Sequence, residues 1–164
     1  MAYGWAQLAF VEKWRLHAVR GQIVGMYRPA DRTFLDLRLR PGEGGAAGLS
    51  SPADLHLVDA GDIIREKRIG LLDRATVVVR VVASSASTAL EVGTGPAAVR
   101  GRRLLEAGSR VAGTLISLDQ DEGLLDVGFP VVVQFAEGAT VEGAQAGKPL
   151  EVTIAETPKG FLVV

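Results

Sequence analysis

The chain has 164 residues, of which 48% are hydrophobic and 23% charged, and its formal net charge at pH 7 is −1. This apolar content excludes disorder over the whole length, and so small a net charge does not by itself require a nucleic-acid partner. The absence of cysteine excludes disulfide bonds, thiolate metal sites and thiol nucleophiles.

Further features of the sequence concern membrane insertion, secretion and adaptation to heat. No apolar run approaches the ~20 residues that span a bilayer. Residues 1–10 lack a basic segment followed by an apolar stretch, so we expect no signal peptide and a cytoplasmic location. Asparagine is absent and arginine outnumbers lysine. This bias is typical of a heat-adapted, thermostable protein, and equally of GC-rich codon usage.

The first predicted strand follows from alternation along residues 13–20, where Lys13, Arg15 and His17 share one face. This period of two predicts a half-buried strand that continues to Tyr27. A helix is the alternative near the N-terminus, because large apolar side chains recur there every three positions.

A turn at residues 28–32 leads to the clearest alternation in the chain, residues 34–40. Its leucines face one way and its polar side chains, with Phe34, face the other. The two segments together predict a long hairpin.

Beyond a glycine-rich loop, Ser51 and Pro52 are typical of a helix start, and Gly61 of its end. A strand through Leu55 and Leu57 is the alternative. A short helix over residues 62–69 and a buried strand over residues 75–82 follow.

The remainder predicts a linker and a second small domain. Residues 83–95 are rich in serine, alanine and glycine, and residues 97–107 form a candidate short basic helix. Five short strands are then expected, at residues 111–118, 124–127, 129–135, 150–154 and 161–164. We therefore expect an N-terminal domain over 1–82, a linker over 83–109 and a C-terminal domain over 110–164. The first is mildly basic and the last acidic.

The strand number and spacing of residues 13–82 and 110–164 resemble the OB-type small β-barrel, including its S1-like RNA-binding variety. The predicted fold is mainly β, with two small OB-like β-barrels and one to three short helices. The resemblance implies binding of oligonucleotides or oligosaccharides on the face of strands two and three.

The predicted ligand surface is the basic and aromatic face of the first hairpin. Cations bind phosphates and exposed rings stack on bases, which is the chemistry that single-stranded nucleic acid requires. The candidate residues are Lys13, Trp14, Arg15, Phe34, Arg38 and Arg40. The alternative is a solvated face, with Phe34 under a loop and Asp36 as partner of the arginines.

Other clusters point less clearly to a site. Arg100, Arg102 and Arg103 could hold phosphate or an acidic protein. The acidic turn around Asp121 lacks the order of a calcium-binding loop. Two histidines are too few for a usual zinc site.

These observations predict no catalytic residues, no metal and no cofactor. We expect a non-enzymatic module that binds single-stranded RNA or DNA and no membrane. The alternative is a protein-interaction or assembly module, as homo-oligomer or adaptor, because the charge differs between the two halves. A sugar or other small ligand is a third alternative.

Overall fold

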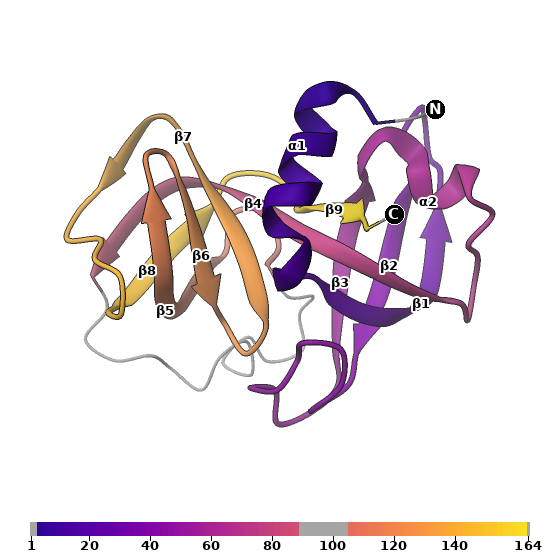
Figure 1. The fold of residues 1–164 in the computed structure, drawn as a ribbon, viewed down its shortest axis with the longest axis horizontal. Coiled ribbons are helices and arrows are strands. Elements are labelled where there is room, and N and C mark those ends of the chain that lie inside the picture. The colour runs from indigo at the N-terminus through magenta and orange to yellow at the C-terminus, as the bar shows by residue number, and fades with distance from the viewer. Residues whose placement is uncertain (1–2, 89–104, 164) are drawn as a thin grey trace.

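The computed structural model describes residues 3–88 and 105–163 and is mainly β (Figure 1). In chain order its elements are α1 (Trp5–Trp14), η1 (Arg15–His17), β1 (Val19–Tyr27), β2 (Phe34–Leu39), β3 (Ala53–Asp59), η2 (Ala60–Asp62), α2 (Ile63–Glu66), β4 (Arg74–Thr88), β5 (Arg110–Asp119), β6 (Glu122–Asp126), β7 (Pro130–Val141), β8 (Pro149–Ile154) and β9 (Lys159–Leu162). In these two stretches of chain, no helix has both the length and the apolar character needed to cross a membrane.

The described strands form one sheet with two closed circuits of pairing. Their order is β1-β2-β3-β9-β4-β7-β6-β5-β8, and β4 pairs additionally with β1 and with β8. The first circuit therefore contains β1, β2, β3, β9 and β4, and the second contains β4, β7, β6, β5 and β8. Closure of this kind leaves few unpaired strand edges.

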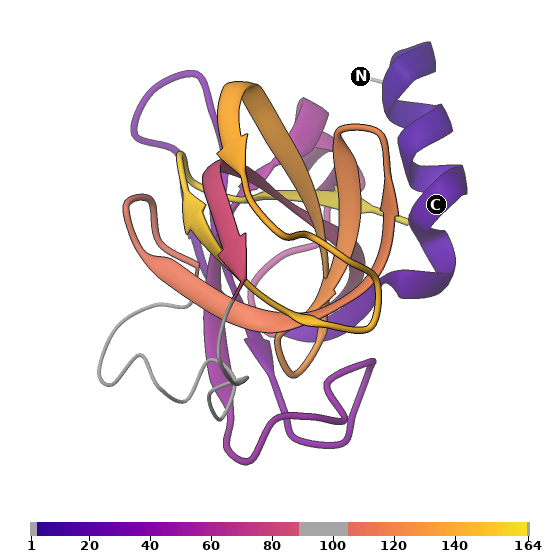
Figure 2. The ribbon, with the colours of Figure 1, turned by 90° about the vertical axis from the view of Figure 1, so that its left-hand side faces the viewer.

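The long strand β4 belongs to both circuits. Its first part pairs with β1 and with β9, and its last part pairs with β7 and β8. Figure 1 shows β4 crossing between two lobes, and Figure 2 shows the strands of the second lobe curving around one another. A run of small and β-branched side chains from Ala75 to Ala83 suits a strand that is buried along most of its length.

Each half of the chain completes the circuit of the other half. The last strand of the chain, β9, lies parallel to β3 and antiparallel to β4 in the first circuit. The end of β4 lies parallel to β7 and antiparallel to β8 in the second circuit. The C-terminal half thus supplies β9 to the first circuit, and the N-terminal half supplies the end of β4 to the second. We call this arrangement the strand exchange.

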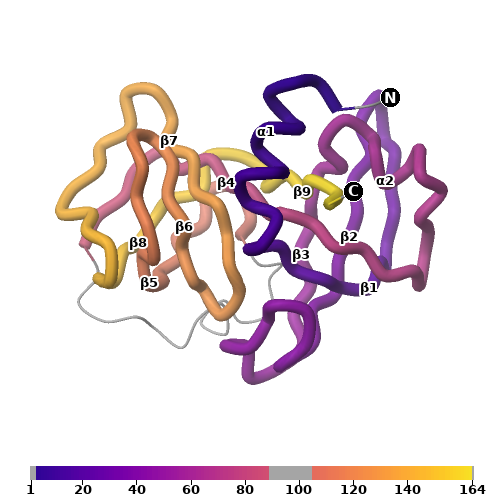
Figure 3. Tube along the Cα trace, viewed as in Figure 1, coloured from indigo at the N-terminus to yellow at the C-terminus, as the bar shows by residue number. Residues whose placement is uncertain are grey.

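The core continues under α1, which covers the junction of the two lobes (Figure 1). Phe10, Val11 and Trp14 are its buried residues, and the rings of Phe10 and Phe161 lie 4.6 Å apart. Both ends of the described chain lie beside this helix (Figure 3). Alternation in β2 places Leu35, Leu37 and Leu39 in the same core, each with no exposed surface.

Two predicted elements are wrong. Residues 13–17 are helical rather than strand, and β1 begins only at Val19. Phe10, Val11 and Trp14 pack inward at helical spacing, so the period of 3.6 prevails over the alternation of charges. The helix predicted from Ser51 is the strand β3, because Leu55 and Leu57 lie opposite leucines of β2.

Most of the remaining predictions agree with the structure. The helix expected over residues 62–69 is present as the shorter α2, and the five strands expected after residue 110 are β5 to β9. Residues 83–88 continue β4, where the sequence predicts the start of a linker. The rest of that linker, with Arg100, Arg102 and Arg103, lies outside the described residues; residues 105–107 are not helical.

Candidate ligand-binding face of β2 and β3

The outward face of β1, β2 and β3 carries a compact group of aromatic and charged side chains. Strand pairing places Asp36 between Gly25 and His56, and Arg38 directly opposite Asp54. Residues opposite one another in antiparallel strands point to the same face. We call this surface the β2–β3 face, and its members are Tyr27, Arg32, Phe34, Asp36, Arg38, Asp54 and His56.

Asp36 lies at the centre of this face and is 8% exposed. Tyr27 Oη donates a hydrogen bond of 2.8 Å to Asp36 Oδ2, and His56 Nδ1 lies 2.7 Å from Asp36 Oδ1. One carboxylate thus contacts two rings from two other strands. Because charge-assisted hydrogen bonds of this length are strong, Asp36 fixes the orientation of both rings.

Gly25 provides the space for this group. A Cβ atom at this position would lie 2.6 Å from Tyr27 Oη and 2.9 Å from Asp36 Oδ2. The pairing of β1 with β2 is also irregular between Ile23 and Gly25, which indicates a bulge. The bulge and the missing side chain together let the Tyr27 hydroxyl reach Asp36.

The rings form a platform with a cation above it. Phe34 and His56 are stacked with centroids 5.4 Å apart and an angle of 7° between their planes. The Arg32 guanidinium lies over Phe34 at 5.7 Å, and the exposed fraction of Tyr27 is 46%. The face therefore offers flat apolar surface and positive charge at adjacent points.

The arginines of β2 differ in their partners. Arg38 donates two hydrogen bonds to Asp54, of 2.9 and 3.1 Å, and this contact raises the pKa of Arg38 above its ordinary value. Arg40 lies just beyond the end of β2, is exposed, and forms no ion pair with a residue in the described ranges. Arg40 and Arg32 thus leave more charge available to a ligand than Arg38 does.

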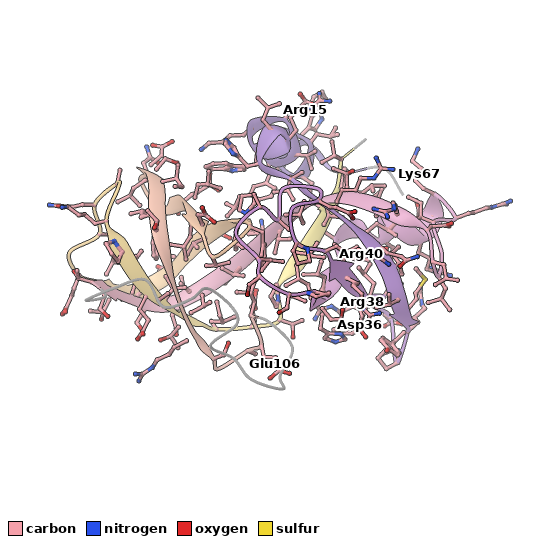
Figure 4. The ribbon with its side chains drawn as sticks, turned by 90° about the horizontal axis from the view of Figure 1, so that it is seen from below. Arg15, Asp36, Arg38, Arg40, Lys67 and Glu106 are labelled. Atoms are coloured by element: carbon pink, nitrogen blue, oxygen red, sulfur yellow. The ribbon has the colours of Figure 1, made fainter. Side chains whose placement is uncertain are left out.

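The other three predicted site residues lie elsewhere, on α1 and η1. Lys13 is bound by Asp119 at 3.3 Å and by Glu122 at 2.8 Å. Trp14 is 6% exposed, which leaves no ring surface for stacking. Figure 4 shows Arg15 on the helix, apart from Arg38 and Arg40. The structure therefore brings together Phe34, Arg38 and Arg40 and separates them from the helix residues.

Sequence reasoning missed Tyr27, Arg32 and His56 as members of this face. His56 was missed because a helix is favoured over its segment, with the strand through Leu55 and Leu57 only as the alternative. The alternation of β3, which places His56 and Asp54 on the side opposite Leu55 and Leu57, was the available signal. The contacts of Arg32 and Tyr27 depend on how the turn between β1 and β2 folds back, which spacing does not reveal.

The remaining candidate groups have structural explanations. Asp119 and Glu122 of the acidic turn bind Lys13. No group of three potential metal ligands occurs within residues 3–88 and 105–163. His17 is exposed and its ring meets the edge of Trp14 at 6.2 Å.

Comparison with known proteins adds no relatives. No protein-family model matches the chain, and no curated protein or solved structure matches it significantly. The chemistry of the β2–β3 face is therefore the basis for a functional proposal.

Proposed function

We propose that the two circuits are OB-type barrels and that the chain is a non-enzymatic module that binds single-stranded nucleic acid on its β2–β3 face. The observation that carries the proposal is the stacked pair of Phe34 and His56 with Arg32 above it. In OB-type barrels the face of strands two and three is the usual place for oligonucleotides. Each circuit has the five strands of that fold.

The energetic argument rests on stacking assisted by charge. Stacking of a base on an aromatic side chain contributes about 1–3 kcal/mol. Tyr27 exposes part of its ring at the edge of the platform, and Asp36 holds it in place. Arg32 lies over Phe34, and Arg40 follows the other end of β2, so both offer positive charge to the phosphates of a strand that runs along the face. Each phosphate contact adds affinity that declines with salt.

Fluorescence anisotropy with labelled single strands tests this proposal. RNA and DNA of about 12 nucleotides are titrated at about 50 mM and about 200 mM salt. We expect binding at low salt that weakens at high salt. Phe34→Leu keeps apolar bulk but removes the ring, and should weaken binding about tenfold.

Arginine variants test whether binding depends on the arginines of the β2–β3 face or only on the total positive charge of the chain. Arg32→Gln and Arg40→Gln should each weaken binding, whereas Arg110→Gln, an exposed arginine at the start of β5, should not. Absence of binding at low salt, or equal losses in all three variants, contradicts the proposal.

A protein-interaction module is the second candidate, and the exposed side of α1 and η1 favours it. Trp5 is 90% exposed, Leu8 39% and Leu16 89%. Large exposed apolar side chains of this kind are common at protein interfaces. Light scattering tests self-association: a dimer that becomes a monomer in Trp5→Ser and Leu16→Ser supports this candidate, and a monomer at all concentrations contradicts assembly.

A further inference from the structure

A cavity of about 470 Å³ lies where α1, the end of β3 and β9 meet. Its lining includes Phe10 of α1, Phe161 of β9 and three cations, which are Arg80 of β4, Lys159 of β9 and Arg32 of the turn between β1 and β2. This volume falls within the usual range for sites that bind small organic molecules. Ala60 and Gly61 add backbone surface at the end of β3.

Arg80 is half-buried at this cavity and packs against two aromatic rings. Its guanidinium carbon lies 5.2 Å from the ring centroid of Phe10 and 4.8 Å from that of Phe161. Its Nε atom is buried and has no hydrogen-bond acceptor among the described residues. Burial lowers the pKa of Arg80, and the negative charges of Glu156 and Glu122 partly oppose this shift. A buried donor without a partner costs free energy, so an acceptor placed at this Nε atom would be stabilising.

Lys159 adds a second positive charge beside Arg80. It lies directly opposite Arg80 in the antiparallel pair of β4 and β9, so both side chains point to the same face and line the cavity. Two like charges at opposite positions destabilise a sheet. Within the described part of the chain, no carboxylate oxygen lies within 4.0 Å of a side-chain nitrogen of either residue.

Four carboxylates line the cavity, those of Asp31, Asp59, Asp62 and Glu156, and none of them forms an ion pair with Arg80 or Lys159. Asp59 accepts hydrogen bonds from the backbone N–H groups of Ile64 and Arg65. Asp62 lies 3.9 Å from Arg28. Asp31 and Glu156 are exposed at the rim.

We propose that this cavity is a binding site for a small organic oxyanion, a carboxylate or a phosphate ester, whose charged group lies between Arg80 and Lys159. Arginine matches such groups because its planar guanidinium donates two parallel hydrogen bonds. The rim carboxylates of Asp31 and Glu156 accept hydrogen bonds from hydroxyl or amino groups. The ligand class is thus a small polar metabolite that carries an oxyanion together with hydroxyl or amino groups.

Nuclear magnetic resonance of the full chain tests the site directly. The probes are inorganic phosphate and acetate, each compared with chloride at the same ionic strength. Phosphate or acetate should shift the Arg80 Nε–H resonance and the amide resonances of β9 in a saturable manner, and chloride should not. The probe with the higher affinity distinguishes a phosphate from a carboxylate ligand.

Matched arginine variants provide the control. Arg80→Lys keeps the charge but loses the guanidinium fork, and should weaken the affinity for the preferred probe about tenfold. Arg110→Lys, on an exposed strand position, should leave it unchanged. Equal affinity in both variants, or no saturable shift of the Arg80 resonance in the unmodified chain, overturns the proposal.

This proposal shares one residue with the nucleic-acid proposal, because Arg32 lines the cavity and also lies over Phe34. Neither Arg80 nor Lys159 belongs to the β2–β3 face, and the probes contain no base or ring. The two sites are distinct if Phe34→Leu loses binding of single-stranded nucleic acid while phosphate or acetate still shifts its Arg80 Nε–H resonance.

Discussion

The hydroxyl of Tyr3 donates a hydrogen bond of 3.2 Å to the backbone carbonyl oxygen of Leu162. This contact joins the segment before α1 to the last strand of the chain. Tyr3 also lies 6.3 Å from the ring of Phe161, and its exposed fraction is 7%. The start of the chain therefore covers β9, which in turn completes the first circuit.

Removing the Tyr3 hydroxyl should destabilise the fold. In Tyr3→Phe the carbonyl oxygen of Leu162 loses a partner while the ring contacts remain, so we expect a loss of about 1 kcal/mol in the free energy of unfolding. Urea unfolding followed by circular dichroism measures it. An unchanged unfolding midpoint would show that the contact contributes nothing to stability.

Alkaline pH should act through the same residue. Burial raises the pKa of Tyr3 above its ordinary value of 10.0. Above about pH 10 the unfolded chain loses this proton while the folded chain retains it, so stability is full below that pH and falls as pH rises. Stability of the unmodified chain should fall more steeply above pH 10 than that of Tyr3→Phe. Parallel pH profiles would contradict this assignment.

The strand exchange predicts that a destabilising substitution in β9 increases local unfolding in both circuits. Phe161 is 1% exposed, and Phe161→Ala should cost about 3–5 kcal/mol. Because β4 belongs to both circuits, hydrogen exchange measured by mass spectrometry should accelerate in β3 and also in β7. Phe129 lies between β6 and β7 and is equally buried, so Phe129→Ala should accelerate hydrogen exchange in β7 and also in β3. Acceleration confined to one circuit would contradict this coupling.

Gly25 should tolerate no side chain, since a Cβ atom there meets Tyr27 Oη and Asp36 Oδ2 at less than 3 Å. We expect Gly25→Ala to break the hydrogen bond between those two residues and to destabilise the chain by about 1–3 kcal/mol. Gly70→Ala is the matched control, because no atom lies within 4 Å of a Cβ atom at that position. Thermal unfolding compares the two variants, and equal melting temperatures would contradict the crowding at Gly25.

Substitutions on α1 should leave the binding of single-stranded nucleic acid unchanged. Lys13 is already bound by Asp119 and Glu122, and it lies on a different element from the β2–β3 face. The anisotropy assay should therefore give the same affinity for Lys13→Met as for the unmodified chain. A loss as large as that of Arg40→Gln would show that the helix takes part in binding.

Local patterns were sufficient for the strands whose burial alternates. The leucines of β2 reveal its inner face, and the strands after residue 110 are separated by recognisable turns. Phe34, Arg38 and Arg40 could be placed on one surface for this reason. The same reasoning was wrong at residues 13–17, where alternating charge coincides with helical spacing of the buried residues.

The contacts that define the candidate sites could not be predicted in this way. Asp36 meets His56 across 20 positions of sequence, and Arg80 meets Lys159 only because β9 returns to β4. Such pairings depend on which strands become neighbours, a choice made by burial of the whole core. They carry no local pattern of their own.

Amino-acid order alone determined the mainly β character, the inner and outer faces of individual strands and the absence of cysteine chemistry, because these depend on short-range periodicity and composition. Tertiary structure alone decided that α1 and η1 place Lys13, Trp14 and Arg15 away from the β2–β3 face. It also decided the strand exchange through β4 and β9. Both outcomes depend on long-range packing, in which side chains far apart in sequence share one buried interior.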